Sequence, residues 1–165
     1  MPISLTLLAR ITGQLTAAPD AGTANVAIAE SLSIDLADGT AAYQANAIYV
    51  DAFTLAGSGT TNIDLAGSLT DPLNQALVFS AVKALLIEAD PANTTDLVVG
   101  NGANPFVGPF GAGAQTLTVK PGGCIMLVNP SAAGWPVVAG TGDILQIANG
   151  AGLAANGRIT VIGER

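Results

Sequence analysis

The sequence predicts an all-β protein, an antiparallel β-sandwich or a jelly-roll-like barrel built from many short strands. Short apolar segments, several of them with two-residue alternation, recur along the chain of 165 residues. Turn signals separate these segments at intervals of about 8–12 residues. The 20 glycines and 9 prolines suit that many turns. The length allows a buried core, and we expect one domain over residues 1–165.

The N-terminal segment predicts either a strand or an extended arm over residues 1–16. Ile3, Leu5 and Leu7 alternate with polar neighbours, which is the period of a half-buried strand. The pattern resumes over residues 11–16 and ends at the turn signal of residues 19–22. Alternation returns towards residue 36, where a turn follows, and a helix over residues 27–31 stays open as an alternative.

The remaining apolar segments predict the strands of the main body. We expect these strands at residues 47–55, 61–67, 96–99, 116–119, 124–128, 136–138, 144–147 and 158–162. The glycine-rich segment Gly100–Gly113 predicts an exposed loop, in which Phe106 and Phe110 either hold the loop to the body or contact a neighbouring subunit. Cys124 lies in an apolar strand, where a small buried role is typical of cysteine.

The stretch from Gln75 to Asp90 is the longest apolar run, and Lys83 is the one charge inside it. Loss of alternation in such a run is typical of a strand that is buried on both faces. Ala, Leu and Lys also favour helix. We favour a central strand over residues 81–89, and a turn of helix just before it stays open. Lys83 is expected to point out of the core, towards a carboxylate or a subunit interface.

Composition excludes several classes of function. The chain has no run of about 18 apolar residues, so we predict no spanning helix and no membrane partner. Its net charge is −7, and its five basic residues are scattered, which argues against nucleic acid as a partner. Only 10% of the residues are charged, against about 25% in ordinary soluble domains. This deficit indicates a protein that hides much of its surface in an assembly.

The sequence offers little catalytic chemistry. Triads of the serine or cysteine type need a base that is usually histidine, and the chain contains no histidine. Zinc sites of Cys and His are excluded by the same count. Acidic pairs such as Asp35 with Asp38, or Glu88 with Asp90, could serve a glycosidase, but turn caps and solvated strand ends are the simpler interpretation. We therefore expect no enzymatic activity, no cofactor and no metal.

Several phrases together resemble small structural proteins encoded among the virion genes of tailed bacteriophages. The phrases lie at residues 64–71, 82–87, 93–100, 119–123, 142–149 and 159–163. They cover roughly the last two thirds of the chain, and they are structural phrases rather than signatures of an active site. The resemblance implies a β-rich virion component that oligomerises and sits on the capsid or the tail.

The resemblance implies, first, a capsid decoration (cement) protein on the head surface, made in the host cytoplasm. Its partners would be further copies of itself, preferably in a trimer, and the major capsid protein or other virion proteins. The candidate interface residues are Ile3, Leu5, Leu7, Lys83, Phe106, Phe110 and Trp135. The alternative is a tail fibre or spike that binds host sugars through Trp135, Phe106 and Tyr49.

Overall fold

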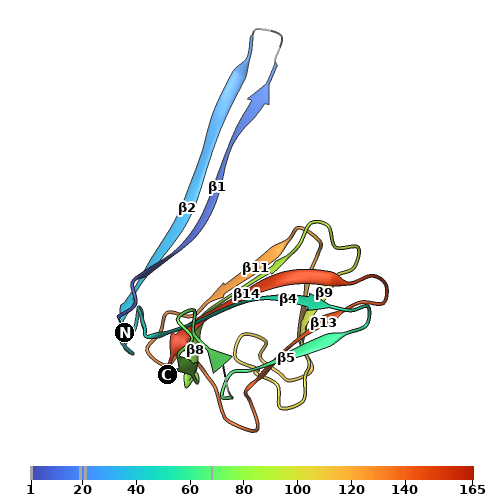
Figure 1. The fold of residues 1–165 in the computed structure, drawn as a ribbon. Helices are drawn as coiled ribbons and strands as arrows, with labels where there is room; N and C mark the ends of the chain where they lie inside the picture. The colour runs from blue at the N-terminus through green and yellow to red at the C-terminus, as the bar shows by residue number, and fades with distance from the viewer. Residues whose placement is uncertain (1, 19, 21, 68) are drawn as a thin grey trace.

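The structure is a computed structural model that describes residues 2–18, 20, 22–67 and 69–165. It has two regions, a β-sandwich body and a long two-stranded arm that projects from one end of the body (Figure 1). Regular structure in the described residues is strand only, so the all-β prediction is confirmed. Within those residues no helix is long and apolar enough to cross a membrane.

The body consists of two antiparallel sheets. The sheet next to the arm, called here the arm-bearing sheet, contains in spatial order β11 (Cys124–Val128), β8 (Ala81–Ala89), β14 (Ala155–Glu164) and β4 (Ala47–Leu55), with the short β12 (Trp135–Pro136) beside β8. The far sheet contains β10 (Thr116–Val119), β9 (Leu97–Gly100), β13 (Ile144–Asn149) and β5 (Thr60–Asp64). A two-residue ladder joins β6 (Leu69–Thr70) and β7 (Ala76–Leu77).

The main core lies between the two sheets. Alternate residues of β8 and β14, such as Ile87, Ile159 and Val161, meet Val99 and Ile147 of the far sheet in one buried cluster. These side chains are almost fully buried because successive residues of a strand point to opposite faces. The inward residues therefore follow the two-residue alternation that the sequence shows.

The central stretch contributes the strand β8, over the same residues 81–89 that the sequence predicts. No helical turn precedes it; residues 76–77 form the short strand β7 instead. A register shift interrupts the pairing of β8 with β14: Ala84 faces Ile162 and Val82 faces Gly163. Lys83 lies between these pairs as the extra residue of a β-bulge, a feature that turns a side chain out of the ordinary alternation.

The arm is a hairpin of β1 (Leu5–Ala17) and β2 (Ala24–Asp38), paired over every residue of β1. The two segments expected before residue 17 form one continuous strand, β1. Residues 27–31 belong to β2 and are strand rather than helix. Only the end of β2 meets another strand, where Ala37 and Asp38 pair with β3 (Gln44–Ala45). The predicted turn at residues 19–22 includes Pro19 and Ala21, which lie outside the described residues.

The base of the arm rests on the outer face of the arm-bearing sheet. Leu36 is buried there in a second, smaller cluster with Ala84 and Ile162 of the sheet. Ile48 and Val128 complete the row of sheet residues beneath the arm. We call this row, Ile48, Ala84, Val128 and Ile162, the seat of the arm. Beyond the seat, the two strands leave the body and continue away from it (Figure 1).

Candidate functional site: an arm with one apolar face

The pairing of β1 with β2 sorts the arm residues into two faces. Odd residues of β1 pair with even residues of β2, and each such pair lies on the same side of the hairpin. One side, called here the apolar face, carries Leu5, Leu7, Ala9, Ile11, Gly13, Leu15 and Ala17 with Leu36, Ile34, Leu32, Glu30, Ile28, Val26 and Ala24. The opposite side carries mainly Thr, Ser, Gln, Asn and Asp residues, together with Arg10 and Leu8.

The apolar face is covered at its base and uncovered beyond it. Leu36 is 1% exposed on the seat, whereas Leu32, four residues away on the same strand and the same face, is 59% exposed. Ile11, Leu15, Val26 and Ile28 are also exposed. These four residues and Leu32 form what we call the distal strip. The apolar face that packs on the body at the base of the arm thus continues along the exposed part of the arm, where it is still apolar.

An uncovered strip of this kind has a physical cost in a single chain. A two-stranded hairpin is marginally stable in water unless another surface packs on it. Contiguous apolar side chains on a soluble protein mark a contact site. The residues of the distal strip all occupy alternate positions of the two strands, with Gly13 and Glu30 at the positions between them, a pattern that a solvated loop has no reason to keep. The distal strip is therefore the candidate functional site.

One charged residue stands on the apolar face. Glu30 pairs across the hairpin with Ile11, and its neighbours two residues away on the same strand are Ile28 and Leu32. A carboxylate that becomes covered with such neighbours needs a cation or hydrogen-bond donors, because desolvation of an unpaired charge is costly. Glu30 therefore restricts the surfaces that can cover the strip to those that present a positive group.

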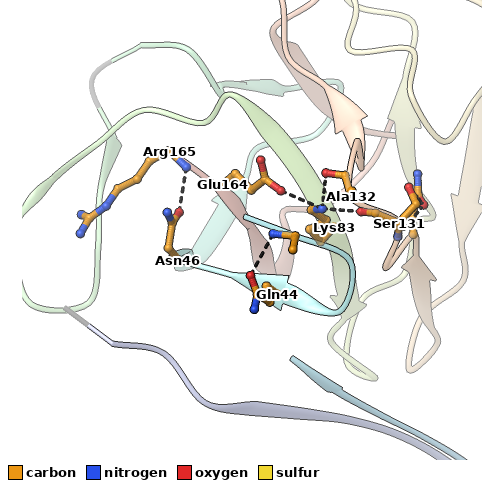
Figure 2. A network of polar contacts seen from close by, with 9 residues as sticks. Gln44, Asn46, Lys83, Ser131, Ala132, Glu164 and Arg165 are labelled. Carbon is orange, nitrogen blue, oxygen red and sulfur yellow. Dashed lines mark hydrogen bonds and ion pairs between the residues drawn. The ribbon is translucent and has the colours of Figure 1, made fainter. Parts of the chain in front are cut away.

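The seat of the arm is held by a buried ion pair (Figure 2). Lys83, with 0% exposure, lies 2.7 Å from Oε1 of Glu164 on β14. Its ammonium also donates hydrogen bonds to the carbonyl oxygens of Ser131 and Ala132 in the loop after β11. Gly134 lets this loop approach: its φ is +56°, and a Cβ there would lie 2.8 Å from the carbonyl oxygen of Val82.

This cluster involves three of the four strands that build the seat, or the loop that follows one of them. Lys83 belongs to β8, Glu164 to β14, and the carbonyl acceptors follow β11, while Ala84, Ile162 and Val128 of those strands contact the arm base. Lys83 does reach a carboxylate, as one alternative of the sequence analysis held. It is nevertheless buried rather than directed out of the body, so it offers no subunit contact, and its role is to fix the platform under the arm.

The predicted interface residues at the N-terminus lie near the site but are not its exposed part. Leu5 and Leu7 belong to the apolar face and pack on the chain's own seat. Ile3 precedes β1, and its backbone N–H donates to Asp38 at 3.1 Å. The interface residues that the sequence predicts do not include the distal strip. Alternation over residues 11–15 and 26–32 was the available signal.

The aromatic candidates serve the body. Phe106 is 2% exposed in the main core, with Phe110 and Trp135 packed against the same cluster. Phe106 therefore offers no surface to a neighbouring subunit, and the two phenylalanines hold the Gly100–Gly113 loop to the body.

Tyr49 is half-buried, and its hydroxyl donates a hydrogen bond to Asp51 at 2.9 Å. Burial, that hydrogen bond and the Asp51 charge raise the pKa of Tyr49 to about 12. These roles leave the sugar-stacking alternative without an observation in its favour.

Several of the acidic residues that could have formed a catalytic pair cap turns or accept hydrogen bonds between strands. Asp71 accepts the backbone N–H groups of Leu73 and Gln75, and Asp90 accepts that of Ala92 at 2.8 Å. Asp35 accepts the Thr6 hydroxyl across the arm. Over the described part of the chain, no three Cys, Asp or Glu residues gather as metal ligands.

Cys124 corrects one sequence expectation. Its side chain is exposed, on the outer face of the arm-bearing sheet beside Glu88, and not buried. All five residues of β11 are apolar, so the sequence of this strand contains no alternation that tells its two faces apart. The thiol is therefore a surface group.

The chain matches no protein-family model, no curated protein and no solved structure.

Proposed function

We propose that the chain is a non-enzymatic structural protein of a tailed-bacteriophage virion, a capsid decoration (cement) protein that stabilises the head shell as a homo-oligomer. The observation that carries the proposal is the arm, which presents an apolar strip outside the body. A decoration protein has to reach across joints of a shell, and an arm of 13 and 15 paired strand residues spans about 45 Å.

Other features support the same proposal. The one buried lysine is paired with a carboxylate and two carbonyl groups, so it serves architecture rather than proton transfer. The net charge of −7 suits a surface that docks on basic patches of a shell. The identification with a phage virion rests on the sequence phrases over the last two thirds of the chain.

Binding to the shell tests the proposal directly. Purified protein is mixed with empty heads of the encoding phage that lack it, and bound protein is counted after sedimentation. We expect saturable binding at a fixed number of copies per shell. Heads that carry the protein should open at a higher temperature than heads without it. A cryo-EM map of the particle gives the position.

Two outcomes contradict the proposal. One is density for the protein on the tail and none on the head. The other is a lack of saturable binding to heads together with binding to host cells, which favours the tail-fibre alternative.

A further inference from the structure

The outer face of the arm-bearing sheet continues beyond the seat with a second row that the described residues cover only in part. The paired residues of this row are Val50, Leu86, Met126 and Thr160. Val50 is 41% exposed and the other three are half-buried. We call these four residues the open row. Because they lie two positions from the seat residues on each strand, they share its face.

A third row on the same face carries charge. Arg158 of β14 is exposed, and it lies between Ala52 of β4 and Glu88 of β8. It borders an open hollow of about 510 Å³ whose lining also includes the carboxylate residues Glu88 and Asp90. In the described residues, ion pairs form at Lys83 and Lys120, so Arg158 has no carboxylate within ion-pair distance.

These surfaces are complementary to the distal strip of the arm. The base of the arm already packs its apolar face on the seat, and the open row continues that seat with the same kind of residue. The strip carries a lone carboxylate, Glu30, and the sheet carries a lone available guanidinium, Arg158. The chain's own arm leaves the body beyond the seat, so the arm that covers the open row comes from elsewhere (Figure 1).

We infer that the distal strip of one copy docks on the open row of a second copy, with Glu30 facing Arg158. This inference deepens the proposed function, and it rests on that function for its biological setting only. Each copy donates one arm and accepts one. The contact is made between identical chains.

The size of the contact agrees with mutual exchange. Ten strand residues beyond the seat and two strand widths give the strip a projected area of about 340 Å², or about 680 Å² buried on both partners. Two such contacts bury at most about 1,400 Å², when the whole strip is covered, which reaches the range of about 1,200–2,000 Å² for stable interfaces. A single docked arm falls below that range, so exchange by both copies is expected.

Self-association of the purified full chain tests whether the distal strip makes the contact between copies. Sedimentation equilibrium is run in a reducing buffer, because the exposed Cys124 could otherwise form a disulfide between copies. We expect the wild type to associate and Ile28→Asp to remain monomeric at the same concentrations. Thr12→Asp, on the opposite face of the arm at nearly the same distance from the seat, should associate as the wild type does. A monomeric wild type, or an Ile28→Asp variant that associates normally, overturns the inference.

Charge exchange tests the landing site. Glu30→Arg alone and Arg158→Glu alone should each weaken association at least about tenfold, because each places like charges together. The double variant restores opposite charges and should associate as the wild type does. Mixing the two single variants also restores opposite charges at each contact between unlike chains, so a tagged copy of one should co-purify the other.

The mixture separates exchange between copies from closure of an arm on its own sheet, because only exchange is rescued between chains. If neither the double variant nor the mixture recovers, the inference that the arm lands beside Arg158 is wrong. The two proposals fail separately. A chain that associates through its arms but does not bind phage heads contradicts only the proposed virion function. A monomer that binds heads contradicts only arm exchange.

Discussion

The arm and the body are built from the same kind of strand, and they differ in what covers their apolar faces. In the body, Ile159 of β14 is buried between two sheets, while in the arm Ile11 of β1 is 70% exposed. Both residues belong to strands with ordinary alternation. Alternation specifies a face that packing can cover, and in the arm that face is left uncovered by the body. Under the proposed arm exchange, a second copy supplies the cover, and the arm is half of a contact.

The boundary between these two regions is the seat, and the largest effect on stability is expected beneath it. Lys83→Met leaves the Glu164 carboxylate and two carbonyl groups without their buried partner, which should lower the free energy of unfolding by about 3–5 kcal/mol. Lys120→Met removes a pair whose lysine is 74% exposed and should cost about 0–1 kcal/mol. Urea denaturation of the monomer measures both.

The pair of variants also tests whether the seat of the arm depends on the ion pair between Lys83 and Glu164. The Lys83→Met variant should lose protection of arm-base amides in hydrogen exchange, and Lys120→Met should retain it. Equal stability of the two variants contradicts a structural role for the buried ion pair.

The second comparison lies within one strand of the arm. Leu36→Ala removes a buried side chain from the seat and should cost about 2–5 kcal/mol. Leu32→Ala changes an exposed position on the same face, so the monomer should change by less than about 0.5 kcal/mol. Thermal unfolding at a concentration below self-association gives both values.

Self-association should depend on Leu32, although the stability of the monomer does not. At higher concentration Leu32→Ala should weaken self-association, because Leu32 belongs to the distal strip. A Leu32→Ala variant that destabilises the monomer as much as Leu36→Ala contradicts the division into a covered and an uncovered half.

A third comparison concerns the body alone, where polar groups tie the two sheets together. Asn149, at the end of β13, is 5% exposed, and its amide donates to the carbonyl oxygens of Leu55, Ala56 and Leu153. Asn149→Ala leaves these acceptors unpaired and should cost about 1–3 kcal/mol. Asn62→Ala, at an exposed position of β5, should stay within about 0.5 kcal/mol of wild type. Equal urea midpoints for the two variants contradict the tie.

Local pattern was sufficient for the body strands but not for the arm. The strand at 81–89 is bounded by a proline and by polar residues, and the strand at 116–119 stands between turn signals, so both were predictable. Residues 27–31, Ala-Ile-Ala-Glu-Ser, suit a helix as well as a strand by composition alone. Pairing with residues 10–14 decides the question, and that pairing depends on the register of a turn.

The site was less predictable than the fold because its parts are distant in sequence. A lysine in a strand is normally solvated, and the groups that bury Lys83 lie 48, 49 and 81 residues further along the chain. Which residues share the apolar face follows only from the register of β1 with β2, since a slip of one residue moves every side chain to the other face. The open row likewise appears only when β4, β8, β11 and β14 are aligned.

The smallest effect expected compares a tyrosine that the body packs with one that it leaves exposed. Burial and the contact with Asp51 raise the pKa of Tyr49 from 10.0 to about 12 in the folded chain, so the fold favours the neutral phenol. This contribution to stability is complete below pH 10 and is lost as the pH rises through about 12. Tyr49→Phe should therefore remove a small part of the alkaline loss of thermal stability, while Tyr43→Phe, at a 57% exposed position, should not. Melting temperatures of the three proteins between pH 9 and 12 measure the difference, and parallel curves for wild type and Tyr49→Phe contradict it.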